Sequence, residues 1–113
     1  MRDYGDFQRR RRERYVPNPE PSLREQVHEV MRFLRYSPRT EEAYWHWVER
    51  FLRYHRVRTQ KGQLVWRHPR QLGVVEVREF LTHLATTLNV SASTQNQALN
   101  ALVFLYGEVL HQS

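Results

Sequence analysis

Two segments of the chain combine hydroxyl and amide side chains with signals for a helix start, and both could bind an anion. The first is Ser37-Pro38-Arg39-Thr40, in which the serine can cap a helix and the proline suits its first position. The second begins at Ser91 or Ser93 and is polar, uncharged and small. Its residues are Ser93, Thr94, Asn96, Gln97, Ala98, Asn100 and Ala101. Free amides at helix starts bind phosphate, and Gln and Asn pair with adenine edges. The alternative interpretation is an ordinary solvated helix start.

The other reactive side chains do not group into a catalytic or metal site. The six histidines show no i, i+4 pair and no metal-ligand spacing with carboxylates. The chain has no cysteine, which excludes disulfides, cysteine-based zinc sites and thiol catalysis. It also has no glycine-rich phosphate loop and no nucleophile elbow. We therefore expect no metal, no cofactor, no small-molecule ligand and no autonomous enzymatic activity.

The composition favours a small basic protein. The 113 residues carry a formal charge of +6, and all but one of the 18 basic residues are arginine, whose planar fork suits phosphate and guanine edges. No apolar run approaches the roughly 20 residues of a membrane span, and the N-terminus lacks the apolar region of a signal peptide. A cytoplasmic protein is the expectation.

The chain divides into an arm and one helical domain. Residues 1–21 hold the run Arg9-Arg10-Arg11-Arg12 and three prolines at alternate positions, so we expect a disordered or extended basic arm. Residues 22–113 have the periodicity of an all-α domain with four helices. The expected helices are Leu23–Tyr36, Ser37–His55, Val74 or Val75 to Leu88, and Ser91 or Ser93 to Leu110.

Three local expectations concern this helical domain. Ser22 and Glu25 can form a capping box, and Asn89 is a plausible left-handed stop. The last helix should bury Leu99, Leu102, Val103, Tyr106, Val109 and Leu110, with its polar face opposite. The connection from Arg56 to Gly73 exceeds the usual 2–8 residues and is a short hairpin or an extended loop.

The helical domain resembles the N-terminal core-binding domain of tyrosine recombinases, and most closely that of integron integrases. The matching residues are Ser37–Tyr44, Trp47–Phe51, His68-Pro69 with Gly73, Glu76-Val77, Phe80–Ala85, Val90, Ser93–Leu102, Phe104–Tyr106 and Glu108–Leu110. The segment Ser93–Leu102 with Phe104–Tyr106 is the most specific part of this resemblance.

The resemblance implies a four-helix, SAM-like bundle that forms one half of a clamp on DNA. Two helices would face the major groove of a recombination half-site. Independently, from the two capped helix starts in a basic domain, we expect these starts to lie side by side against a nucleic-acid groove. By position, the DNA-binding residues would be Arg39, Thr40, Ala43, His46, Ser93, Thr94, Gln97 and Asn100. Other recombinase protomers in a synaptic tetramer would be further partners.

The family's catalytic domain, with its nucleophilic tyrosine, has no counterpart in this chain. We therefore expect that the chain does not cut or join DNA by itself, and that Tyr106 belongs to a core stripe. Residues 58–67 look like an insertion whose basic side chains could add backbone contacts. The alternative function is a helical protein-interaction domain without nucleic-acid binding, using Trp45, the end of the last helix and the long connection.

Overall fold

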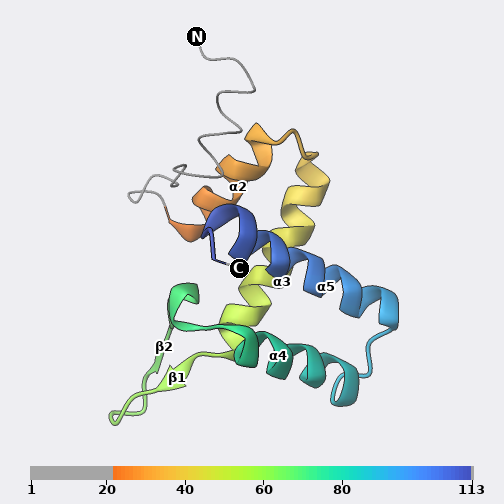
Figure 1. Cartoon of the computed structure of the whole chain (residues 1–113). Coiled ribbons are helices and arrows are strands. Elements are labelled where there is room, and N and C mark those ends of the chain that lie inside the picture. Colours follow the sequence, from red (N-terminus) through yellow and green to blue (C-terminus); the bar gives the residue numbers. More distant parts are fainter. Residues whose placement is uncertain (1–21, 113) are drawn as a thin grey trace.

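Helices form nearly all of the regular structure in the computed structural model, which describes residues 22–112 (Figure 1). The elements are α2 (Leu23–Phe33), α3 (Pro38–Tyr54), β1 (Val57–Arg58), β2 (Leu64–Val65), the 3₁₀ turn η1 (Pro69–Gln71), α4 (Val74–Thr86), α5 (Ala92–Phe104) and the π turn η2 (Leu105–Val109). The predicted all-α class with four helices is confirmed. The predicted arm, residues 1–21, lies outside the described residues.

Two helices begin with the same serine–threonine cap. The Ser37 Oγ accepts a hydrogen bond from the Thr40 amide at 3.2 Å, and the Ser91 Oγ accepts one from the Thr94 amide at 3.1 Å. Each serine hydroxyl also donates to the threonine Oγ1 at 3.0 Å. The caps predicted for α3 and α5 are therefore confirmed, and Ser91 rather than Ser93 begins α5.

The helix ends come earlier than the periodicity predicted. The helix α2 ends at Phe33 rather than Tyr36, because Arg35 adopts a left-handed conformation with φ of 67°. The helix α4 ends at Thr86, and Asn89 adopts the left-handed conformation predicted for it, with φ of 54°. After Phe104, the chain widens into a π turn, which carries the C-terminal apolar residues into the core.

The core lies where α5 crosses α3, and it differs from the predicted stripe. Ala98 and Ala101 are completely buried, although both were predicted on the polar face of the last helix. Leu99 and Val103, predicted as core residues, are 37% and 61% exposed. The buried stripe is rotated because α3 packs against the alanine side, where small side chains allow the two helices to come close. Sequence hydrophobicity alone favoured the larger aliphatic residues.

A buried carboxylate joins α2 to the first turn of α3. The Glu41 side chain is almost fully buried, and its Oε1 lies 2.8 Å from His28 Nδ1 and 3.8 Å from Arg32 Nη2 on α2. His28 Nε2 lies 3.5 Å from Oε1 of the neighbouring Glu42, which also pairs with Arg24 at 3.4 Å. These contacts fix the direction in which α3 leaves the α2–α3 turn.

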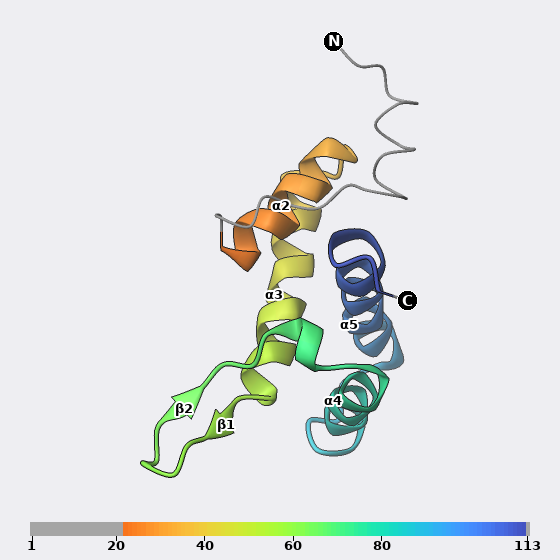
Figure 2. The same cartoon turned by 60° about the vertical axis from the view of Figure 1, so that its left-hand side comes forward.

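The long connection after α3 forms a small antiparallel hairpin. Val57 pairs with Val65 and Arg58 with Leu64, and Gly62 at the turn has φ of 82°, which glycine adopts without strain. The hairpin leaves the lower end of α3 and projects on the side away from α5 (Figure 2).

Among residues 22–112, no helix has the length and apolar character needed to cross a lipid bilayer.

Candidate nucleic-acid interface

The outward face of α3 carries three of the predicted contact residues. Arg39, Ala43 and His46 recur at spacings of four and three residues, which places them on one stripe of the helix, and all three are exposed. The same periodicity continues the stripe to Arg50. Thr40 is half-buried at its edge, with its hydroxyl engaged by the cap. The stripe thus presents guanidinium groups and one imidazole around a small alanine.

On α5, four residues share a second stripe. Ser93, Gln97, Asn100 and Phe104 follow at spacings of four, three and four, and the first three are exposed. The Phe104 ring lies 5.6 Å from the Tyr44 ring of α3, between ring centroids. Because Phe104 belongs to this stripe, the ring contact places the C-terminal end of the stripe beside the first half of α3.

The same contact relates the two stripes to each other. Thr40 lies one helical turn before Tyr44, just as Asn100 lies one turn before Phe104. The residues next to the ring contact, Thr40 and Ala43 on α3 and Gln97 and Asn100 on α5, therefore flank one shared corner between the crossing helices. Thr94, the remaining predicted residue, is half-buried and held in the α5 cap.

The two helix starts do not lie side by side, contrary to our expectation. The start of α3 lies beside the end of α2, whereas α5 begins beside the end of α4, and both views show the separation (Figures 1 and 2). A hydrogen bond of 3.1 Å from Gln95 Nε2 to the Leu81 carbonyl attaches the α5 start to α4. The helices cross because α5 runs from α4 toward α2, so its end, and not its beginning, meets the start of α3.

The exposed side chains of the two stripes are either basic or uncharged. The residues of α5 include no charged side chain. On α3, the exposed Glu42 pairs with Arg24, and Glu49 pairs with Arg53 at 3.5 Å. Within residues 22–112, Arg39 makes no ion pair, so its guanidinium is available to an anion.

Sequence reasoning missed the extension of the α3 stripe around Trp47. The Arg50 guanidinium lies over the Trp47 ring, 4.9 Å from its centroid, and the His46 ring meets the same indole edge-on at 5.2 Å. Trp47 is almost buried, so it supports these two polar groups from below. The i, i+3 spacing of Trp47 and Arg50 was the available signal.

Tyr106 has a structural role, as the sequence indicated. Its hydroxyl donates a 2.7 Å hydrogen bond to the Pro69 carbonyl and so attaches η1 to η2. Burial, reinforced by the negative charge of Glu76, raises the Tyr106 pKa to about 12. A neutral, hydrogen-bonded phenol of this kind is not an activated nucleophile.

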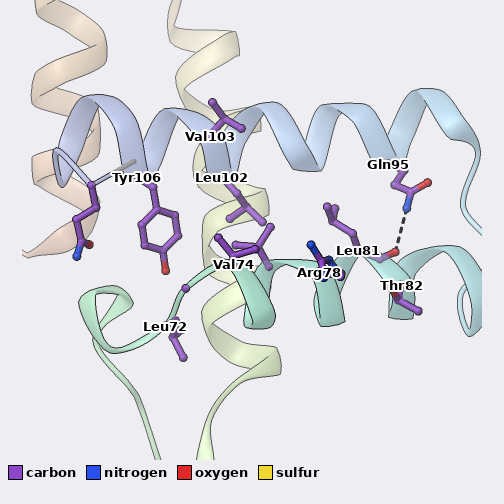
Figure 3. A pocket seen from close by; sticks show the side chains of 12 residues that line it. Leu72, Val74, Arg78, Leu81, Thr82, Gln95, Leu102, Val103 and Tyr106 are labelled. Carbon is purple, nitrogen blue, oxygen red and sulfur yellow. Dashed lines mark hydrogen bonds between the residues drawn. The ribbon is translucent and has the colours of Figure 1, made fainter.

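A groove of about 550 Å³ lies between α4 and α5 (Figure 3). Its walls are mainly apolar, with Leu72 and Tyr106 toward one end and Gln95 toward the other. Val74 and Val103 at its rim are 68% and 61% exposed. This groove lies on the α4 side of α5, whereas the Ser93–Gln97–Asn100 stripe faces the corner with α3.

The comparison with known families agrees with this architecture. The family model described as phage integrase, N-terminal SAM-like domain, matches residues 23–113, and this range includes all eight predicted contact residues. The chain belongs to this family. Its four helices are thus a SAM-like bundle, as the sequence predicted.

Two curated members of the wider group are similar in sequence. Proteins described as "Integrase/recombinase" from Escherichia coli and from Pseudomonas aeruginosa are each 48% identical to this chain over 97 residues. Each match covers 81% of this chain and 26% of the relative. The chain therefore spans about a quarter of the length of these relatives, and the matched family model describes an N-terminal domain.

Proposed function

We propose that the corner between α3 and α5 binds duplex DNA, and that the chain is the DNA-binding module of a site-specific tyrosine recombinase. One observation carries this proposal. The exposed predicted residues form an outward stripe on each of two helices that meet at the Tyr44–Phe104 contact. The α3 stripe carries arginines, one of them stacked on Trp47, and the α5 stripe carries uncharged amides. A groove-binding surface needs both kinds of group, because cations contact phosphates and amides pair with base edges.

The chemistry divides between the two helices. Arg39, which has no intramolecular ion pair among residues 22–112, contacts a phosphate, and Arg50 adds positive charge along the same stripe. His46 offers ring nitrogens for hydrogen bonds on this stripe. Gln97 and Asn100 present carboxamides that can pair bidentately with adenine. Ala43 on α3 has a small side chain, which leaves space for the close approach of a base edge or a sugar.

The finer assignment follows from the resemblance. We propose an integron integrase-like role, in which the domain grips a recombination half-site as one half of a clamp. The catalytic half of that clamp would belong to a larger protein. DNA integration and recombination would require that larger protein. A cytoplasmic location remains a prediction.

Salt-dependent binding tests the proposal. A labelled duplex, enriched from a random pool by the 113-residue chain, is titrated at several salt concentrations. Each phosphate contact contributes about −0.9 to the slope of log K against log salt. Arg39→Gln should reduce the steepness by about one contact and weaken binding to every sequence. Gln97→Ala should cost about 1–3 kcal/mol on the enriched sequence and little on others.

The matched control is Arg78→Gln, which removes one arginine charge from α4 at the other side of α5. It should leave the salt slope nearly unchanged. If Arg78→Gln weakens binding as much as Arg39→Gln, the attraction is a property of net charge and the α3–α5 surface is not the site.

The groove between α4 and α5 favours a second role, in protein contact. Its exposed valines, Val74 and Val103, border an apolar recess that water covers in the isolated chain. We propose that other recombinase protomers cover this groove during synaptic assembly. Light scattering measures the mass of the chain with and without DNA and so tests this role. An increase in mass on adding DNA, which the variant Val103→Ser abolishes, would support it. A constant monomer mass on saturated DNA would contradict it.

A further inference from the structure

The β1–β2 hairpin lies within a segment of unusual charge. Residues 50–75 contain seven basic residues and no acidic residue, whereas the rest of the helical domain mixes both signs. The basic residues of this segment are Arg50, Arg53, Arg56, Arg58, Lys61, Arg67 and Arg70. A solvated loop of this length has no need to exclude acids, so the composition indicates a polyanionic ligand.

The hairpin is held in a defined shape by its own polar groups. Arg58 Nη1 donates to the Gly62 carbonyl at 2.7 Å, and the Thr59 amide donates to the Gln63 carbonyl at 2.7 Å. The Gln63 amide in turn donates to Thr59 Oγ1 at 3.1 Å. These bonds rigidify the tip, where Lys61 is exposed. A preorganised tip loses little entropy when it binds.

An indole and a guanidinium lie at the base of the hairpin. The Arg56 guanidinium stacks over the Trp66 ring, 5.2 Å from its centroid, and Trp66 is 54% exposed. The half-buried Arg56 also donates from its Nε to the Arg53 carbonyl at 3.2 Å, which holds the side chain in place and leaves its terminal nitrogens for other partners. Arginine in this arrangement retains free N–H donors for a phosphate oxygen.

We propose that the β1–β2 hairpin is a second nucleic-acid-binding element, which contacts the phosphodiester backbone through Arg56, Arg58 and Lys61. It projects from the end of α3 on the side away from α5, so its contact is separate from the α3–α5 surface (Figure 2). The inference rests on the proposed function in taking DNA as the ligand. The phosphates can belong to the duplex on the α3–α5 surface or to a second duplex.

Tethered cleavage locates the contact, and the absence of cysteine from the chain makes the labelling specific. An iron chelate is attached to the Gln60→Cys, Ser93→Cys or Glu29→Cys variant of the 113-residue chain. Gln60 lies at the hairpin tip, Ser93 on the α5 stripe and Glu29 on the exposed face of α2. With a labelled mixed-sequence duplex, iron at the first two positions should cleave DNA, and iron at Glu29 should not.

The outcomes separate the two proposals. Cleavage from Ser93 without cleavage from Gln60 overturns the hairpin contact and leaves the α3–α5 surface intact. Cleavage from Gln60 alone supports the hairpin and removes the α3–α5 surface. If iron at neither position cleaves DNA, both the hairpin contact and the α3–α5 surface are overturned. If the chain self-associates through the hairpin and iron at Gln60 does not cleave DNA, the hairpin makes a protein contact instead.

A bridging assay with charge variants identifies the source of the phosphates. A duplex is immobilised, and retention of a second, labelled duplex is measured for the wild type and for Lys61→Gln. If the hairpin binds a second duplex, Lys61→Gln should flatten the salt slope of retention by about 0.9 and leave occupancy of the first duplex nearly unchanged. If it binds the same duplex, the slope of primary binding flattens instead. Two unchanged slopes would overturn the contribution of Lys61 and, with it, the proposed contact at the tip.

Discussion

The buried pair of Glu41 and His28 offers a quantitative test of how α3 is positioned. Glu41 is 5% exposed, and its carboxylate lies 2.8 Å from the imidazole of His28 on α2. The substitution Glu41→Ala removes this bond and leaves His28, whose side chain is only 14% exposed, without its main partner. We expect a large loss of stability, because a buried polar group without a partner retains its desolvation penalty.

The magnitude follows from the geometry. A hydrogen bond to a charged group contributes about 1.5–3 kcal/mol, and the side chains of His28 and Glu41 are 14% and 6% exposed. We therefore expect Glu41→Ala to lower the free energy of unfolding by about 2–3 kcal/mol. For a domain of this size, such a loss lowers Tm by roughly 10–20 °C. Glu41→Gln, which can still accept a bond from an imidazole N–H, should cost less than Glu41→Ala.

Urea unfolding followed by circular dichroism measures these losses, with a double-mutant cycle through His28→Ala. The cycle should give a coupling of about 1 kcal/mol or more between the two side chains. The control is Glu29→Ala on the exposed face of α2, which should change stability by less than about 0.5 kcal/mol. A cost of Glu41→Ala equal to that of Glu29→Ala, with zero coupling, would show that the Glu41–His28 contact does not stabilise the domain.

Three further predictions concern the end of α5 and the start of α4. Phe104→Ala should cost about 3–5 kcal/mol in chemical unfolding, because it removes an almost buried ring that joins α5 to α3; a cost below about 1 kcal/mol would contradict this packing. Tyr106→Phe should cost about 1 kcal/mol by leaving the Pro69 carbonyl without its donor. The raised Tyr106 pKa means that wild-type stability falls as pH rises from about 10 to about 12, and the variant should lose that part of the alkaline decline. The Glu76 carboxylate accepts a 2.7 Å hydrogen bond from the Gly73 amide, and this bond lowers the pKa of Glu76. The free energy of unfolding should therefore fall at acid pH, as Glu76 is protonated and the bond is weakened. Acid titrations of Glu76→Gln should show a smaller dependence on pH.

The sequence was most informative where a single residue has one strong local preference. The Ser37-Pro38 cap and the left-handed Asn89 were both predicted correctly, because these residue types have few alternatives at helix ends. The fold class followed from periodicity alone. Arg35 carried no comparable signal, since an arginine with positive φ is set by the packing of the following turn, and α2 was therefore predicted too long.

Tertiary contacts decided the features that the sequence left open. Ala98 and Ala101 are core residues only because α3 crosses α5 at that point, and no local pattern distinguishes them from surface alanines. Glu41 lies in the first turn of α3, where an acid needs only the helix dipole, yet a partner on another helix buries it. Arg39, Ala43 and His46 share one stripe of α3, and Ser93, Gln97 and Asn100 share one stripe of α5, but the direction in which α5 crosses α3 separates the two helix starts.

The proposed DNA binding depends on one surface, formed where α3 and α5 cross. The most direct test is an NMR titration of the 113-residue chain with the enriched duplex, in which amide shifts report contact residue by residue. We predict the largest changes at Arg39–Arg50 and Ser93–Asn100, with a second set at the hairpin, and little change on the outer face of α2 around Glu29. Shifts confined to α2 or to the groove between α4 and α5 would contradict it, as would a saturated complex that leaves both stripes unchanged.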